Sequence, residues 1–431
     1  MTAGRGGRYC PDIDEDQAAT LNDPSPAPTS RTWASPSLPD AEARTVRSLA
    51  RPLVTLLAIA LVFRPQTIAI GPLLPSIQNS LDISHGVAGA LTSIPVLCMG
   101  IFAPLGPVLA RRLGARWALA VCALLVIVFG LLRLGVPGAA AVLALTFGIG
   151  LGMGLAGPIF PLVVRHSTPA RPALGTGAYA IGLVLGATVA AAVVVPLAGE
   201  GHDWRFALSV VTLAGLASLA VWLGLAPTDD RPDETVEPSP IPWRRPIAWV
   251  LGLLFGLQSM LYYGAITWLA AVYVDRGWSE ADAGNLVALF GATTLVATAV
   301  MPLGADRIGT RHGQLIFSSL LILIGLTGVS LLSEPAIVWA IVVGAGMGAI
   351  FPIVLTLPLD VGGRPADVAA TAAMMLLVGY VLSATSPLAF GIARDATGNY
   401  GLGESLLIGL GVVLVALCVA LTPERLHRVG A

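Results

Sequence analysis

The stretch PVLARRLGAR, from Pro107 to Arg116, has a counterpart in PLGADRIGTR, from Pro302 to Arg311, 195 residues further along the chain. A second stretch, GMGLAGPIFPLVV from Gly152 to Val164, is echoed by GMGAIFPIVL from Gly346 to Leu355. The offset is close to half of the 431 residues. Two matches at corresponding positions predict two structural repeats that follow one another in parallel order.

The segments that contain these repeats are strongly apolar. Hydrophobic residues make up 55% of the chain and charged residues 11%, with a mean hydropathy of +0.82, which excludes an ordinary water-soluble domain. Stretches of about 20 apolar residues, long enough to cross a bilayer as helices, recur between short charged turns. We predict an all-α membrane protein with twelve transmembrane helices in two pseudo-symmetric six-helix bundles: 52–75, 86–109, 116–134, 139–164, 173–197, 206–226, 247–273, 282–304, 313–332, 336–359, 367–391 and 402–421.

Polar segments separate the bundles and close the chain. The first fifty residues are rich in Pro, Asp, Ser, Ala and Arg and contain no apolar core long enough for a signal peptide, so a disordered cytoplasmic tail is expected. The predicted domains are this tail (1–50), an N-terminal six-helix bundle (51–226), a cytoplasmic linker (227–246), a C-terminal six-helix bundle (247–422) and a short cytoplasmic C-terminal tail (423–431).

Every one of the 24 cationic residues is an arginine. A Walker A loop needs a lysine for the nucleotide phosphates, so the glycine run from Gly148 to Pro158 is no such loop, and ATP hydrolysis is not expected. Sixteen arginines fall on the side shared by both termini, against four on the other side. Because cationic loops stay in the cytoplasm, we predict a multi-pass protein of the plasma (cytoplasmic) membrane with both termini cytoplasmic.

The repeated loop carries a family resemblance. Its pattern, G-x-x-x-D-R-x-G-x-R, is similar to the hallmark loop of the major facilitator superfamily, whose members expose a midplane site alternately to each side. In the second copy Asp306, Arg307, Gly309 and Arg311 fit well, whereas the first copy has Arg111 in the place of the usual Asp. Both copies have a proline, Pro107 or Pro302, in the place of the first Gly. The resemblance implies a role in conformational gating for Arg111, Arg112, Gly114, Arg116, Asp306, Arg307, Gly309 and Arg311.

Four longer stretches resemble one branch of that superfamily, which contains cyanate permeases and 2-nitroimidazole exporters. They are FRPQTIAIGPLLPSI (63–77), LTSIPVLCMGIFAPLGP (91–107), FGLQSMLYYGAITWL (255–269) and VGYVLSATSPLAFGIARDATG (378–398). The resemblance implies a cyanate-like or nitroimidazole-like solute. It does not indicate whether the solute is imported or exported.

Arg64 is the strongest candidate for a substrate-binding residue. It lies near the middle of the first predicted span, where a guanidinium costs roughly 2.5 kcal/mol or more without a partner or a wet cavity. No acidic residue is expected at that depth, so the missing partner is interpreted as the substrate, and a planar fork of donors suits small anions. The alternative is that Arg64 bonds backbone carbonyls beside Pro65, which has no N–H of its own.

Other polar and aromatic residues lie within predicted spans. Gln258 and Tyr262 form an i, i+4 pair on one helix face, and Gln66 lies at the position that corresponds to Gln258, 192 residues earlier. Trp268 either stacks on a planar substrate or belongs to an interfacial aromatic belt. The predicted substrate-binding set is Arg64, Gln66, Gln258, Tyr262, Thr267, Trp268, Tyr179, Tyr380 and Ser383. Hydrogen bonding between helices is the alternative for Gln258 and Tyr262, and helix packing is the alternative for Tyr179, Tyr380 and Ser383.

The functional hypothesis is a secondary active or facilitative transporter of a small polar, anionic or planar solute. The alternative is a multidrug-type efflux carrier of more hydrophobic compounds. An enzyme is not expected because the five histidines fall at loops and termini, and no cofactor, metal, nucleic acid or obligate protein partner is implied. The partners expected are the substrate and the lipid bilayer. Uniport, exchange and proton symport all stay open, since no titratable group is expected at midplane depth.

Overall fold

The structure is a computed structural model that describes residues 38–169, 171–199, 204–226, 240–304, 310–332, 335–361 and 365–422. The chain divides into two compact units, Met1–Val46 and Arg47–Ala431. Of the first unit only residues 38–46, the beginning of helix α1, are described. Within the described ranges the secondary structure is entirely helical.

The N-terminal half contains ten α-helices and one short 3₁₀ helix in its described part. They are α1 (Leu38–Ala60), α2 (Pro65–Ile68), α3 (Ile70–Leu81), α4 (His85–Ile101), the 3₁₀ helix Ala103–Leu105, α5 (Gly106–Leu113), α6 (Ala115–Leu132), α7 (Ala139–Ala156), α8 (Ile159–Ser167), α9 (Pro172–Ala198) and α10 (Trp204–Leu225).

The C-terminal half has fewer and longer elements. They are α11 (Pro246–Asp275), α12 (Glu280–Gly304), α13 (Arg311–Thr327), a π-helical turn (Gly328–Leu332), α14 (Ala336–Asp360), α15 (Pro365–Ser383), α16 (Thr385–Thr397) and α17 (Gly401–Ala420). In the described residues, eleven helical segments are long and apolar enough to span a bilayer. The bent pair His85–Ile101 and Ala103–Leu113, with a 46° bend, makes the twelfth. The twelve predicted spans are thereby confirmed.

Four of the twelve spans are broken, and each break precedes or contains a proline. Pro65, Pro104, Pro158 and Pro387 lie at the breaks of the first, second, fourth and eleventh spans. A proline has no N–H to give to the carbonyl four residues earlier, and its ring clashes with that carbonyl. The sequence predicts continuous helices for these four spans, and the structure differs from that prediction at the breaks.

Helix α1 starts earlier than the predicted first span. It begins at Leu38, within the segment expected to be a disordered tail, so that expectation is wrong for residues 38–50. The sequence LPDAEAR places a proline and two acidic residues at the beginning of this helix, the composition that favours a helix N-terminus. Residues 1–37, 227–239 and 423–431 lie outside the described residues; they hold the rest of the predicted N-terminal tail, most of the predicted linker and the predicted C-terminal tail.

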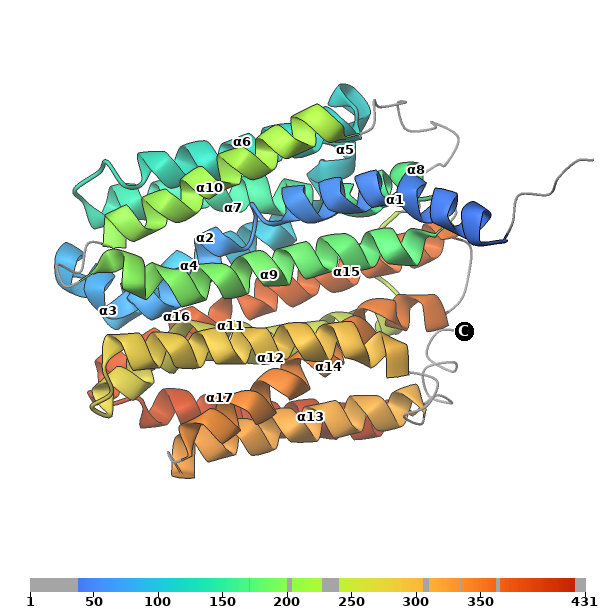
Figure 1. The fold of residues 1–431 in the computed structure, drawn as a ribbon. Helices are drawn as coiled ribbons and strands as arrows, with labels where there is room; N and C mark the ends of the chain where they lie inside the picture. Colours follow the sequence, from blue (N-terminus) through green and yellow to red (C-terminus); the bar gives the residue numbers. More distant parts are fainter. Residues whose placement is uncertain are drawn as a thin grey trace, which may run out of the picture. The chain divides into compact units, whose positions relative to one another are not determined.

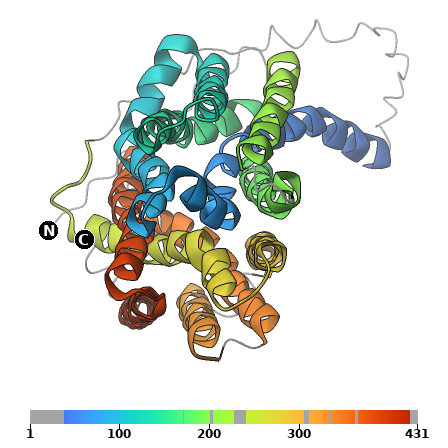
Figure 2. The same ribbon diagram turned by 90° about the vertical axis from the view of Figure 1, so that its left-hand side faces the viewer.

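The two halves pack side by side along their helices. In Figure 1, α5, α6, α7 and α10 lie on one side, α12, α13, α14 and α17 on the other, and α9, α11, α15 and α16 between them. The principal contacts across the boundary join α9 to α12, α4 to α16, α4 to α15 and α3 to α11. Figure 2 views this bundle from the end at which α3 and α4 meet.

The repeated glycine motif packs in the same way in both halves. A Cβ built on Gly154 of α7 would lie 2.3 Å from the carbonyl oxygen of Cys98 in α4, and one built on Gly348 of α14 would lie 2.2 Å from that of Thr294 in α12. Real Cβ atoms do not approach backbone oxygen so closely, so only glycine allows these helices to touch. The sequence repeat therefore corresponds to a repeated helix contact.

Candidate functional site

A cavity lies at the boundary between the two halves. It contains about 420 Å³ of space not filled by atoms, part of which is open to solvent. The N-terminal half contributes two described lining residues and the C-terminal half nine: Arg64, Val184, Gln258, Ser259, Tyr262, Tyr263, Thr294, Thr298, Met347, Phe351 and Tyr380. The wall is therefore highly asymmetric, with its only described charge on the N-terminal half.

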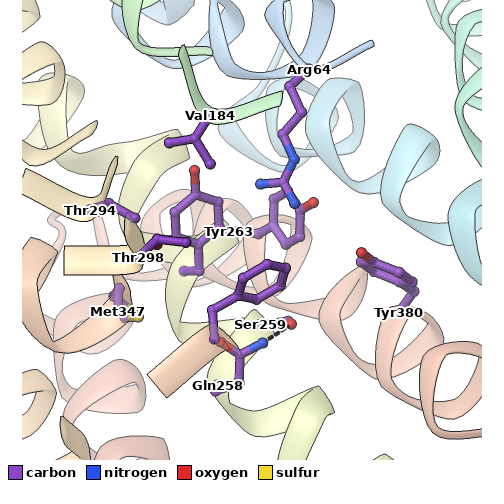
Figure 3. Close-up of a pocket in the computed structure, with 11 residues that line it drawn as sticks. Arg64, Val184, Gln258, Ser259, Tyr263, Thr294, Thr298, Met347 and Tyr380 are labelled. Atoms are coloured by element: carbon purple, nitrogen blue, oxygen red, sulfur yellow. Dashed lines mark hydrogen bonds between the residues drawn. The ribbon is translucent and has the colours of Figure 1, made fainter. Parts of the chain in front are cut away.

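Arg64 occupies this cavity because the first span is broken next to it. The backbone between Ala60 and Pro65 forms turns rather than regular α-helix, and Arg64 is the residue that precedes the four-residue helix α2. Its side chain is partly exposed. Figure 3 shows it reaching down from the N-terminal half, with Tyr263, Ser259 and Gln258 below it and Tyr380 to one side.

Aromatic rings surround the guanidinium. The Cζ atom of Arg64 lies 5.8 Å from the centroid of the Tyr262 ring and 6.0 Å from that of Phe351, and the phenols of Tyr263 and Tyr380 also belong to its electrostatic surroundings. A cation within about 6 Å of a ring centroid is attracted by the ring's quadrupole. The rings therefore stabilise the cation without neutralising its charge.

No carboxylate in the described part of the chain pairs with Arg64. The ion pairs there are His85 with Asp395, Arg276 with Glu404, Arg311 with Asp360 and Arg394 with Asp275. The structure also gives the Arg64 side chain no hydrogen bond to a described backbone carbonyl, which was the structural alternative for this residue. Among the described residues the cavity therefore presents a cation without a carboxylate partner, with the hydroxyls of Tyr262 and Tyr380 as its hydrogen-bonding neighbours. A guanidinium of this kind can receive a small anion.

The opposite wall of the cavity is neutral, and several of its polar groups already form hydrogen bonds with other groups of the protein. The Nε2 of Gln258 lies 2.5 Å from Oγ of Ser259, while the hydroxyls of Thr294 and Thr298 donate to the carbonyl oxygens of Gly344 and Gly348 at 3.2 and 3.1 Å. The carbonyl of the Gln258 amide is left as a group that can orient a bound solute, whereas the hydroxyls of Tyr262 and Tyr380 interact with Arg64 and that of Tyr263 lies 3.9 Å from Sδ of Met99. This wall suits recognition of shape and polarity more than of charge.

Arg64, Gln258, Tyr262 and Tyr380 of the predicted substrate-binding set thus line one cavity. Their part in binding stays a prediction. Tyr263, Thr294 and Phe351 also line the cavity but were not predicted. An aromatic or threonine residue in an apolar helix is usually a packing residue, so the sequence did not single them out. The only sequence signal for Tyr263 is its position next to Tyr262.

The remaining predicted residues lie elsewhere. Gln66 is 3% exposed and faces α6 and α10, with its Nε2 donating to Oγ1 of Thr212 at 2.7 Å. Thr267 is buried, and Ser383 donates to the carbonyl of Gly379 within its own helix at 2.6 Å. Tyr179 stacks on Phe160, with ring centroids 4.9 Å apart. The structure does not bring these four residues to the cavity wall.

Trp268 also lies away from the Arg64 cavity. It is 1% exposed, stacks on Phe390 with ring centroids 5.5 Å apart, and donates from Nε1 to the carbonyl of Pro387 at 2.9 Å. Such burial contradicts an interfacial-belt residue, and its position gives no support to stacking on a substrate bound at Arg64. Trp268 packs α11 against α16.

The predicted gating residues are only partly described. Asp306, Arg307 and Gly309 lie outside the described residues, whereas both side-chain oxygens of Asp360 accept from Arg311 Nη1, at 2.5 and 2.6 Å. Arg111 and Arg112 are exposed in the last turn of α5, and Gly114 adopts a positive φ of 80° between α5 and α6. Arg116 donates to the carbonyl of Leu223. Arg116 and Arg311 contact residues of their own halves, and the part of all these arginines in gating stays a prediction.

A cross-half contact that the sequence analysis did not identify lies where α4 begins. Asp395 of α16 accepts from the backbone N–H groups of His85 and Gly86 at 2.9 and 2.8 Å, and its Oδ1 lies 2.8 Å from Nδ1 of His85. A carboxylate at a helix N-terminus satisfies free N–H groups and complements the helix dipole. We call this part of the bundle the His85 end and the opposite part, where α5 ends, the Arg111 end.

The two ends differ in what their helices touch. At the His85 end, a Cβ on Gly89 would lie 2.3 Å from the carbonyl oxygen of Pro387, and one on Gly391 would lie 2.2 Å from that of His85. At the Arg111 end, the main contacts of α5 and α8 are with other helices of the N-terminal half. The described structure therefore joins the halves most closely at the His85 end.

These features, two repeated bundles around a shared cavity, agree with comparisons to known proteins. The family model described as Major Facilitator Superfamily matches residues 56–387. The chain belongs to the major facilitator superfamily. Its helices and its relatives make it a multi-pass membrane transporter and not an enzyme.

Two relatives from Escherichia coli K12 are similar in sequence to most of this chain. The 2-nitroimidazole transporter is 30% identical over 369 residues, covering 85% of this chain and 92% of its own. The cyanate transport protein CynX is 30% identical over 350 residues, covering 81% and 91%. The inward-open structure of the xylose transporter XylE from E. coli has a TM-score of 0.71 at 15% identity, covering 88% of this chain and 98% of XylE, which shows a shared fold.

Proposed function

We propose that the protein transports a small planar anion by alternating access, with the anion bound at Arg64 between the two halves. The observation that carries this proposal is the unpaired guanidinium in the cavity. A planar fork of N–H donors matches the oxygen or nitrogen atoms of a small planar or linear anion. The name of the cyanate relative supports this class of solute.

A second candidate is a neutral planar compound of the nitroimidazole kind. The rings of Tyr262, Phe351 and Tyr380 that border the cavity favour it, since they offer faces and edges on which a flat solute can stack. The name of the 2-nitroimidazole relative supports it as well. The alternative function, efflux of larger hydrophobic compounds, has less support, because the cavity wall contains the charged residue Arg64.

Coupling to protons through a side chain of the cavity has no support in the described residues. None of the residues that line the cavity is Asp, Glu or His. A cycle in which the bound anion alone changes the charge of the site needs no such group, so uniport or anion exchange is the simpler mechanism. The arginine excess at the Arg111 end supports a cytoplasmic location for that end and for both termini in the plasma membrane.

Thermal stabilisation of the detergent-purified protein tests the proposal. Cyanate, nitrate, small carboxylates and a neutral nitroimidazole are compared at fixed ionic strength for the wild type and Arg64→Gln. A ligand at 100 times its Kd stabilises the folded state by about 2.7 kcal/mol, so concentration-dependent stabilisation of the wild type is expected for a planar anion.

Arg205→Gln is the matched control, because Arg205 lies in the same half and its guanidinium bonds Ser80 and the carbonyl of Val136 rather than facing the cavity. Stabilisation that is lost in Arg64→Gln and kept in Arg205→Gln supports the proposal. Equal responses of all three proteins to the anions would refute a site at Arg64. A response to the neutral compound alone, unchanged in Arg64→Gln, would favour the second candidate.

A further inference from the structure

A second buried arginine lies behind the Arg64 site. Arg133 follows the last turn of α6 and is 1% exposed. Its Nη2 donates to Oε1 of Gln66 at 3.2 Å, and its Nε and Nη1 have no acceptor among the described groups. No described carboxylate pairs with it. Burying a cation without an anionic partner costs free energy, and a functional role of Arg133 would explain why this cost is tolerated.

Arg133 begins a directional chain of hydrogen bonds across three helices. Gln66 of α2 accepts from Arg133 and donates from Nε2 to Oγ1 of Thr212 in α10 at 2.7 Å. Thr212 in turn donates to the carbonyl of Leu208 at 2.6 Å. A Cβ built on Gly130 would lie 3.3 Å from Oε1 of Gln66, so the amide also packs tightly against α6. The Gln66 side chain is thereby held by both neighbouring helices.

The helix that carries Gln66 has little rigidity of its own. Helix α2 has four residues and is separated from α1 by the break that ends at Arg64. So short a helix is not stable by itself, and tertiary contacts must set its orientation. Residues two apart on a helix point to nearly opposite sides, which agrees with Arg64 facing the cavity while Gln66 faces α6 and α10.

We propose that Arg133 is a positioning residue for the anion site, acting through Gln66. It fixes α2 against α6 and α10, so that the Arg64 guanidinium is presented to the cavity and moves with the N-terminal half. This inference rests on the proposed function for its binding readout. Its second readout, the mobility of residues 61–69, does not depend on any ligand.

A double-mutant cycle tests the connection. Cyanate affinity is measured by calorimetry for the wild type, Arg133→Gln, Gln66→Leu and the double variant, with Arg205→Gln as the charge-matched control. We expect each single variant to weaken binding about three- to ten-fold, the range that one or two hydrogen bonds provide. The double variant should resemble the single ones, because both changes break one chain. The control should stay within about two-fold of wild type.

Hydrogen–deuterium exchange supplies the ligand-independent measurement. Exchange of the amides in residues 61–69 should accelerate in Arg133→Gln and Gln66→Leu but not in Arg205→Gln. If Arg133→Gln fails to fold, Thr212→Val removes the last side-chain member of the chain at nearly constant volume and should show the same two changes in smaller degree.

Unchanged exchange of this segment in folded variants, or independent additive losses of affinity, would overturn the positioning role. If the wild type binds none of cyanate, nitrate and the small carboxylates while exchange responds as expected, the proposed function fails and the positioning of α2 stands. If cyanate binds and depends on Arg64 while neither readout responds to Arg133, the positioning role alone fails.

Discussion

The first span of the N-terminal half and the first span of the C-terminal half reach the same cavity in different ways. The N-terminal one is divided into α1, α2 and α3 and contributes a charge, whereas α11 runs unbroken over 30 residues and contributes Gln258, Ser259, Tyr262 and Tyr263. Gln66 and Gln258 occupy related sequence positions, yet only Gln258 lines the cavity. A repeat in sequence therefore does not guarantee a repeat in function when one copy contains a proline that ends its helix.

Moving the charge from the broken helix to the unbroken one tests this asymmetry and is expected to have the largest effect. Arg64→Gln should weaken cyanate binding at least ten-fold, about 1.4 kcal/mol or more. Adding Gln258→Arg on that background should recover part of the loss, because both side chains line one cavity. Calorimetry on the two variants checks this, and no recovery would show that the site depends on the broken helix itself.

The contact between these two spans should be the next most sensitive feature. A Cβ on Gly71 of α3 would lie 2.4 Å from the carbonyl oxygen of Ile266 in α11, so Gly71→Ala forces the helices apart at the His85 end. We expect a loss of stability of about 1–3 kcal/mol and faster maleimide labelling of Ile77→Cys, which is buried beside it.

Gly224→Ala is the control for that change, because Gly224 lies within α10 and has open space where its Cβ would be. It should leave labelling of Ile77→Cys unchanged. Equal labelling in Gly71→Ala and Gly224→Ala would show that the α3–α11 contact does not keep this end closed.

A smaller effect is expected from the aromatic wall of α11. Tyr262→Leu keeps the volume apolar but removes the ring that faces the Arg64 guanidinium, and should weaken anion binding by about three- to five-fold, near 1 kcal/mol. Tyr179→Leu removes a tyrosine that stacks on Phe160 outside the cavity wall, and should change the Kd by less than about two-fold. A larger loss of anion affinity in Tyr179→Leu than in Tyr262→Leu would indicate that the anion binds closer to α9.

The smallest effect is expected from Gln258→Leu. Its amide nitrogen already bonds Ser259, so only its carbonyl is free, and an acceptor contributes little to binding an anion. A change in cyanate Kd of no more than about three-fold is expected, with a larger change for a neutral nitroimidazole that can donate a hydrogen bond. Titrations of this variant with cyanate and with the nitroimidazole check this. A greater loss of affinity for cyanate would contradict the assignment of anion binding to the Arg64 wall.

Hydropathy and arginine placement were sufficient to predict the spans and the two-bundle architecture. Apolar stretches of this length have few alternatives to membrane helices, and the repeated loops related the halves. Arg64 could be found for the same reason, since a charge within an apolar span needs an explanation. Pro65 was the visible sign of the break beside it.

The rest of the site depends on which helix face turns inward, and the sequence does not determine that in a membrane. Both faces of a span are apolar, so Gln66, Thr267 and Ser383 looked equivalent to Gln258 although they are buried away from the cavity. The bond between Asp395 and the beginning of α4 escaped prediction because its partners are 310 residues apart and each reads as an ordinary residue at a span end. Only the packing of α4 against α16 brings them together.

The Asp395 contacts affect the access of a solute to the cavity from the His85 end. Three bonds to one carboxylate exist only while the His85 end is closed, so they lower the free energy of that arrangement relative to any arrangement in which α4 and α16 separate. A solute that arrives from that side binds only when these bonds are broken, so its apparent affinity is reduced by the free energy of breaking them. The same binding site would then show a higher half-saturation concentration for solute from the His85 side than it would without these bonds.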